Sequence, residues 1–100
     1  MHPEEPMTLP IRHEPDARRF VADVGGKAAY ITYRQHDGQL LELDHTYVPR
    51  ELRGGGVASQ LTVRALEYAR ERGCRVVPSC PFVAAFIERH PEYRELRVGL

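Results

Sequence analysis

Apolar and polar residues alternate through the first half of the chain, whereas from residue 57 onward apolar residues recur every three or four positions. A period of two is typical of a strand with one buried face, and a period near four is typical of an amphipathic helix. The pattern therefore predicts a first half built of strands and a second half dominated by helices.

Residues 18–49 predict an antiparallel meander of three strands. The pairs Gly25-Gly26 and Asp37-Gly38 stand between β-rich runs, where two-residue turn signals of this kind indicate hairpins. An additional strand is expected before the meander, near Thr8 to His13.

One face of each strand is expected to be buried. Alternation places Ala29, Ile31 and Tyr33 together on the middle strand. On the following strand the same rule predicts a shared face for Leu41, Leu43, His45 and Tyr47.

A long amphipathic helix is predicted after residue 56. Its buried face is marked by a spacing of four, with Gly73 as the residue that follows its end; the residues of this face are Val57, Leu61, Ala65, Leu66 and Ala69. Residues 74–79 then read as a short buried strand.

A second helix is predicted from Pro81, which fits a first helical position, with Ser79 or Cys80 as its N-cap. Phe82–Phe86 and Val83–Ile87 are i,i+4 apolar pairs on it. Residues 91–100 are expected to form a helical turn and a short strand. The order β-β-β-α-β-α-β describes an α+β domain whose strand–helix–strand portion is a right-handed crossover between parallel strands.

Composition narrows the class of protein. One hundred residues suit a single domain, and the formal net charge of zero disfavours a nucleic-acid or anionic-membrane partner. No apolar run reaches the roughly 20 residues needed to span a bilayer, and no signal-peptide layout opens the chain. Only two cysteines, Cys74 and Cys80, are present, which favours a reducing cytoplasm over a disulfide scaffold.

Three consecutive glycines, Gly54, Gly55 and Gly56, precede the first helix. They fit either a flexible loop or a phosphate site, because a helix N-terminus offers unpaired N–H groups that glycine leaves accessible. A P-loop is excluded because no Gly-Lys-Ser/Thr follows. A dinucleotide fingerprint also fails, because residues 72–87 contain no Asp or Glu.

The run from Arg53 to Ala58, preceded by Val48-Pro49, resembles the pyrophosphate loop of the GNAT acetyltransferases, Arg/Gln-x-x-Gly-x-Gly/Ala. Arg53, Gly56 and Ala58 occupy its three specified positions. The resemblance implies a minimal GNAT-like fold that binds acetyl-CoA, with the pyrophosphate on the backbone of Arg53, Gly54, Gly55, Gly56, Val57 and Ala58. It also implies a strand that splays from its neighbour, with the backbone of Tyr47 and Val48 facing the thioester carbonyl.

The segments "VVPSCPFVAAFIERHPEY" and "HTYVP" are similar to the small, single-domain GNAT-like proteins of the YjdJ type. The likeness extends from about Thr8 to Val98, so we expect residues 1–7 to be a flexible tail and residues 8–100 to be the acetyl-CoA-binding domain. Full-length GNAT enzymes use two early helices and late strands for the acceptor, and this chain has room for neither. The resemblance therefore implies the coenzyme half of the site more firmly than the acceptor half.

Three side chains are candidates for catalysis. His45 is a candidate general base, or a histidine that closes one edge of the core. Cys80 is a candidate acyl carrier or proton donor, because a helix N-terminus favours the thiolate; the alternative is a small buried hydrophobe. By the resemblance, Tyr93 is a candidate general acid, although a capping aromatic fits equally well.

The predicted activity is transfer of an acetyl group from acetyl-CoA to a primary amine on a small molecule, a lysine or an N-terminus, with no metal. The acceptor is unknown and a protein is one option. The alternative is a non-catalytic module that binds or senses acyl-CoA. The sequence does not define an oligomeric state.

Overall fold

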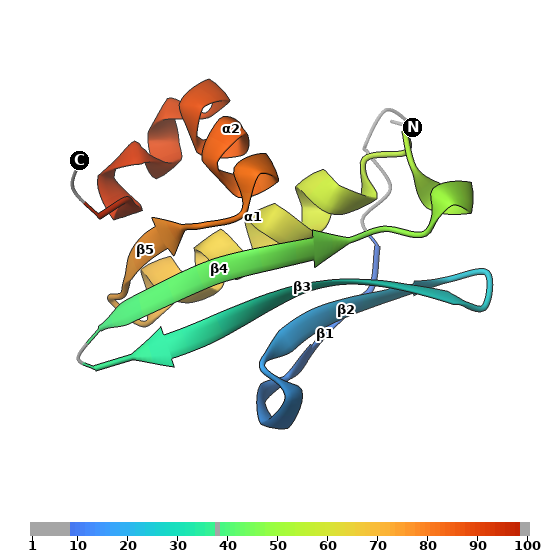
Figure 1. Cartoon of the computed structure of the whole chain (residues 1–100), viewed down its shortest axis with the longest axis horizontal. Coiled ribbons are helices and arrows are strands. Elements are labelled where there is room, and N and C mark those ends of the chain that lie inside the picture. The colour runs from blue at the N-terminus through green and yellow to red at the C-terminus, as the bar shows by residue number, and fades with distance from the viewer. Residues whose placement is uncertain (1–8, 38, 99–100) are drawn as a thin grey trace, which may run out of the picture.

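The computed structural model describes residues 9–37 and 39–98 and shows one mixed sheet with its helices (Figure 1). The predicted tail at residues 1–7, together with residues 8, 38, 99 and 100, lies outside the described residues. In chain order the elements are β1 (Ile11–Glu14), η1 (Pro15–Ala17), β2 (Arg19–Val24), β3 (Lys27–His36), β4 (Leu40–Tyr47), η2 (Arg50–Leu52), α1 (Val57–Glu71), β5 (Arg75–Pro78), α2 (Pro81–Arg89) and η3 (Pro91–Leu96).

The five strands lie side by side in chain order, β1-β2-β3-β4-β5. Pairing is antiparallel from β1 to β4, which confirms the predicted meander and its additional first strand. Gly25 and Gly26 take φ values of 56° and 81° in the β2–β3 turn, a conformation that glycine adopts without a steric penalty. β4 and β5 are parallel and are joined through α1, as the predicted crossover requires.

Both long helices pack on one face of the sheet, where they bury a single apolar core. The predicted face of α1 is confirmed: Val57, Leu61, Ala65, Leu66 and Ala69 are all buried, and Gly73 follows the helix with φ of 70°. α2 begins at Pro81 with Cys80 as its N-cap, and contributes buried Val83, Phe86 and Ile87. Within residues 9–37 and 39–98, no helix is long and apolar enough to cross a membrane.

The opposite face of the sheet carries no helix in the described part of the chain, and we call it the open face. Its side chains alternate with those of the core. On β3 the open face includes Tyr30, Thr32 and Arg34, because Ala29, Ile31 and Tyr33 are buried against the helices.

The predicted shared face on β4 is wrong in its second half. Leu41 and Leu43 are buried, but the register shifts so that Thr32 pairs with His45 while Tyr33 pairs with Leu43. Asp44 is the extra residue of this β-bulge, and a bulge reverses the alternation beyond it. His45 and Tyr47 therefore lie on the open face, and Thr46 takes the inward position.

The C-terminal prediction is confirmed in its first part. Residues 91–96 form a 3-10 helix, as the expected helical turn. As far as residue 98, the expected strand is present as one parallel bridge between Val76 and Arg97, and its last two residues lie outside the described part of the chain. The Val98 N–H donates to the Val76 carbonyl at 2.9 Å, which holds this end of the chain against β5.

Candidate functional site

The site begins where β4 extends beyond the end of β5, its parallel neighbour. The last β4–β5 pair is Leu43 with Pro78, after which the Cys80 N–H donates to the Leu43 carbonyl at 3.0 Å and the chain turns into α2. Residues 44–47 of β4 continue beyond this point, and His45, Thr46 and Tyr47 pair with β3 on the other side. We call residues 44–47 the β4 overhang. Within the described residues, no strand pairs with the overhang on the β5 side.

A pocket of about 260 Å³ lies beside the end of this overhang, between η2, the start of α1 and the start of α2. We call it the glycine-loop pocket. Its lining residues are Val48, Leu52, Arg53, Gly54, Gly56, Val57, Ala58, Ser59 and Phe82. Six of the eight residues predicted to bind the coenzyme are among them; Tyr47 and Gly55 are not.

Two glycines shape the loop through their backbone. Gly54 and Gly56 have φ values of 87° and 83°, in the left-handed region that favours glycine. Apart from the glycine itself and its chain neighbours, no described atom lies within 4 Å of the position that a Cβ would take at either residue, so both face open space. A side chain at either position would strain the backbone and would fill space that the protein leaves free.

The start of α1 offers hydrogen-bond donors to this pocket. The N-cap is Gly56, which provides no side-chain cap, and the first turn contains no acidic residue. The first N–H groups of a helix lack partners within the helix and lie at the positive end of its dipole. Arg53 adds a cation, and its Nε donates to the Val48 carbonyl at 2.9 Å, which ties the loop to the end of the overhang. These features suit an anionic group such as a pyrophosphate.

Cys80 lies where β5 ends and α2 begins. Its side chain is buried, and its Sγ lies 3.5 Å from the Thr46 Oγ1, in a contact where either atom can donate. This contact brings α2 and the overhang together beside the last strand pair. Cys74, the other cysteine, is also buried and free.

His45 lies on the open face, on the side of β4 opposite Thr46. Its ring is 6.4 Å from Tyr30, which also lies 5.4 Å from Tyr47 and carries the Arg19 guanidinium over its ring at 5.3 Å. Tyr47 is exposed. The predicted base is therefore not a core residue; it belongs, with Tyr30 and Tyr47, to a row of aromatic rings on the open face of the overhang and β3.

Asp44 anchors the bulge that produces this arrangement. Thr32 Oγ1 donates to its Oδ1 at 2.6 Å and Arg34 Nε donates to its Oδ2 at 3.2 Å. Burial acts to raise the pKa of Asp44, but these two hydrogen bonds outweigh it and hold the pKa below its ordinary value. Asp44 therefore supports the strand as a carboxylate, fixed by its partners on β3.

The structure does not bring Tyr93 to the pocket. Its hydroxyl donates to Glu67 Oε2 at 2.7 Å, and the Arg70 guanidinium lies over its ring. Glu67 is ten residues beyond the start of α1, or roughly 15 Å along the helix axis at 1.5 Å per residue. Burial, followed by the Glu67 bond, raises the pKa of Tyr93 to about 12. These contacts fit the capping role better than that of a general acid.

Sequence reasoning missed Thr46, Phe82, Leu52 and Ser59 as neighbours of the site. Thr46 was missed because the bulge exchanged the two faces of β4. Phe82 was assigned only to an apolar pair on α2, and its ring does lie 6.4 Å from that of Phe86. Phe82 also lines the glycine-loop pocket, because the N-terminus of α2 lies close to the N-terminus of α1.

The mixed sheet, the β4 overhang and the glycine loop at the head of α1 form a small α+β domain with a pocket suited to an anionic group. Comparisons with known proteins show which family has this fold. The GCN5-related N-acetyl-transferase family matches residues 19–96 of this chain. The NMR solution structure of a GCN5-like protein from Staphylococcus aureus superposes with a TM-score of 0.73 at 34% identity, covering 93% of this chain and 91% of that one.

Vertebrate relatives are similar over most of the chain. Protein NATD1 of Homo sapiens is 30% identical over 86 residues, covering 82% of this chain and 76% of that protein. Protein NATD1 of Bos taurus is 28% identical over 91 residues, covering 89% and 80%. The chain belongs to the GCN5-related N-acetyltransferase family.

Proposed function

We propose that this protein binds acetyl-CoA in the glycine-loop pocket and transfers its acetyl group to a primary amine. The observation that carries the proposal is the pocket itself. Two left-handed glycines, a helix start with no side-chain cap and Arg53 surround open space beside the β4 overhang. Membership of the acetyltransferase family supports the same assignment.

The pocket and the overhang bind different parts of the coenzyme. The loop from Arg53 to Ala58 holds the pyrophosphate through backbone N–H groups, while Phe82 and Leu52 supply apolar contact nearby. The pantetheine arm then follows the free side of the overhang toward Thr46 and Cys80. There, strand backbone without a β5 partner is available to pair with the amides of the arm and to polarise the thioester carbonyl.

The acetyl transfer needs a proton acceptor and a proton donor. The amine nitrogen attacks the carbonyl carbon, its proton passes to a base, and the C–S bond breaks with the electron pair on the coenzyme sulfur. His45 is the proposed base, because it lies on the open face, next in sequence to Thr46 and accessible to an incoming amine. Two roles suit Cys80: proton donor to the departing thiolate, or acceptor of the acetyl group in a two-step transfer.

The first test is thermal unfolding with and without acetyl-CoA, together with the intact mass of the protein after incubation. Coenzyme at 100 times its dissociation constant stabilises the fold by about 2.7 kcal/mol. Gly56→Glu is the matched loss-of-binding variant, because it places a carboxylate where the pyrophosphate is expected. No stabilisation of the parent protein would refute the coenzyme assignment.

The mass distinguishes the roles of Cys80. A gain of one acetyl group that Cys80→Ala abolishes, and that His45→Gln retains, identifies Cys80 as the acyl carrier. Stabilisation and turnover without an adduct identify direct transfer. Stabilisation with no transfer to any amine would leave a non-catalytic module that binds acyl-CoA.

A further inference from the structure

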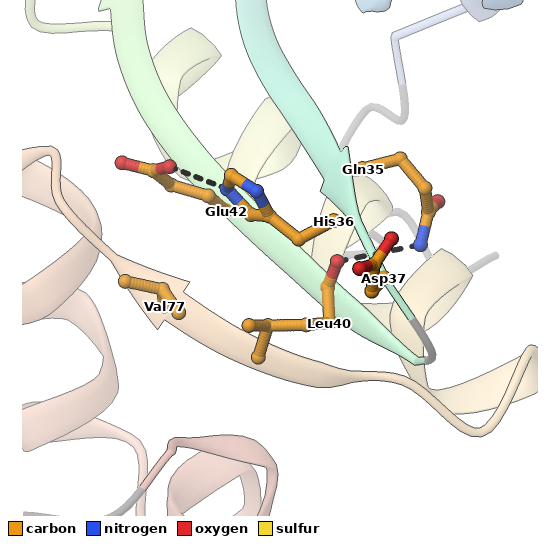
Figure 2. Close-up of a pocket in the computed structure, with 6 residues that line it drawn as sticks. All are labelled: Gln35, His36, Asp37, Leu40, Glu42 and Val77. Carbon is orange, nitrogen blue, oxygen red and sulfur yellow. Dashed lines mark hydrogen bonds and ion pairs between the residues drawn. The ribbon is translucent and has the colours of Figure 1, made fainter.

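The open face carries a second concavity at the hairpin end of β4, which we call the hairpin hollow. Its volume is about 560 Å³, and it is lined by Gln35, His36, Asp37, Leu40, Glu42 and Val77. Figure 2 shows Leu40 and Val77 between β4 and β5, with the Glu42–His36 pair farther along β4. The hollow therefore has an apolar floor and a polar rim.

Two carboxylates among its lining residues, those of Glu42 and Asp37, give the hollow a negative charge. Glu42 accepts a hydrogen bond from Ser79 Oγ at 2.5 Å and pairs with His36 Nε2 at 2.8 Å. These bonds, that of Ser79 first, lower the pKa of Glu42, so it is a carboxylate at neutral pH. Asp37 is a second carboxylate on the rim.

No lysine or arginine is among the residues that line the hollow. Arg34 lies directly opposite Glu42 in the β3–β4 register, and its charge also lowers the pKa of Glu42, but its Nε donates to Asp44. Arg75 donates to the Arg97 carbonyl at 3.1 Å. The hollow is thus suited to a cation with an aliphatic stem, because the stem covers Leu40 and Val77 while the charged head reaches Glu42.

The hollow and His45, the proposed base, lie on the same face of β4. Ser79, the partner of Glu42, directly precedes Cys80. From Glu42 to the His45–Thr46 position is three or four residues, or about 10–13 Å at 3.3 Å per residue. An extended polypeptide laid along β4 covers this distance with three or four residues of its own.

We infer that the acceptor amine is a lysine of a polypeptide, and that a lysine or arginine two to four positions away from it binds in the hairpin hollow against Glu42. The inference rests on the proposed function and extends it to the class of acceptor. We choose a polypeptide over a linear polyamine because the hollow, at about 560 Å³, also has room for the backbone that carries the basic side chain.

The test uses capped eight-residue peptides with one lysine. In one set an arginine stands two, three or four positions from the lysine; in the comparison set alanine replaces it, or the arginine stands six positions away. Acetyl transfer is followed by mass spectrometry, and binding of fluorescein-labelled peptides is followed by anisotropy. We expect about a fivefold higher kcat/KM and a fivefold lower Kd for the first set, the size of one charge pair.

Glu42→Gln should remove this preference through KM while kcat is retained, because the amide oxygen still accepts from Ser79. Asp16→Asn is the matched control: it also removes one carboxylate, from exposed η1 at the opposite edge of the sheet, and should keep the preference.

Equal rates and equal affinities across the peptides would overturn the inference, as would transfer to linear polyamines but not to peptides. Stabilisation by acetyl-CoA without arginine-dependent peptide binding would overturn it and leave the coenzyme assignment intact. Arginine-dependent binding that Glu42→Gln abolishes, in a protein that acetyl-CoA does not stabilise, would support the hollow and refute the proposed function.

Discussion

Gly55 and Gly56 are neighbours in sequence with opposite requirements, and this contrast gives a sharp prediction. Gly56 has φ of 83°, whereas Gly55 has no positive φ and a Cβ there would meet only the Leu52 carbonyl, at 3.7 Å. An alanine at a left-handed position costs about 1–2 kcal/mol. At a compatible position, the loss of unfolded-state freedom gains about 0.4–1 kcal/mol instead.

Gly56→Ala should therefore destabilise the protein by about 1 kcal/mol once the unfolded-state gain is subtracted, and Gly55→Ala should be neutral or stabilising. In a domain of this size 1 kcal/mol corresponds to about 4–8 °C in Tm, so the two variants should differ by about 10 °C. Differential scanning calorimetry measures both values, with far-UV circular dichroism as the check that each variant folds.

Binding should separate the variants in the same direction. The Gly56→Ala methyl enters open space in the glycine-loop pocket, so its Kd for acetyl-CoA should rise about tenfold, which corresponds to 1.4 kcal/mol. Gly55 does not line the pocket, so its variant should bind normally. Equal Tm and equal Kd for the two variants would refute the argument that the loop is set by backbone conformation.

Three further predictions follow from single side chains. Arg53→Ala removes the bond to the Val48 carbonyl and one cation, so we expect acetyl-CoA to bind about tenfold more weakly by calorimetry; an unchanged Kd would place the coenzyme elsewhere. Tyr93→Phe loses the bond to Glu67 and should cost about 1 kcal/mol at pH 8 in urea unfolding. Because the folded pKa of Tyr93 is raised from 10.0 to about 12, its contribution is complete below pH 10 and is lost as the pH rises through 12, so the variant should lack that loss. Burial, then the charges of Arg64 and Arg72, lower the pKa of His13 below 6.5, so its contribution is complete above pH 6.5 and is lost as the pH falls through the folded value. His13→Phe keeps a ring against Phe20 and should flatten the fall in Tm between about pH 7.5 and pH 5; an unchanged slope would assign the fall to other groups.

The sequence predicted those parts of the fold that depend on local periodicity. The four-residue spacing from Val57 to Ala69 is a property of one helix, and the structure buries that face as expected. Gly73 and Pro81 mark a helix end and a helix start through backbone geometry alone, and both predictions are confirmed.

Prediction failed where tertiary pairing decides the outcome. No local pattern around Asp44 predicts a bulge, because the residues that hold Asp44 there, Thr32 and Arg34, lie on the neighbouring strand. His45 and Tyr47 were consequently assigned to the wrong face. For Tyr93 the sequence left open a general acid and a capping aromatic, because its contact with Glu67 depends on how η3 packs against α1, which no local pattern contains.

The order of the strands bears on how the molecule assembles. Each of β1 to β4 pairs with its neighbour in sequence, so this part of the sheet needs only short loops to close. The β4–β5 pair spans α1 and is the non-local closure, which costs more chain entropy and is expected to form late. The glycine-loop pocket and Cys80 lie just beyond the end of the β4–β5 pair. Native-state hydrogen exchange should therefore show that the β4–β5 pair opens before the hairpins of β1 to β4. A ligand bound to both β4 and the start of α2 would link the late-forming half of the molecule to the early-forming half.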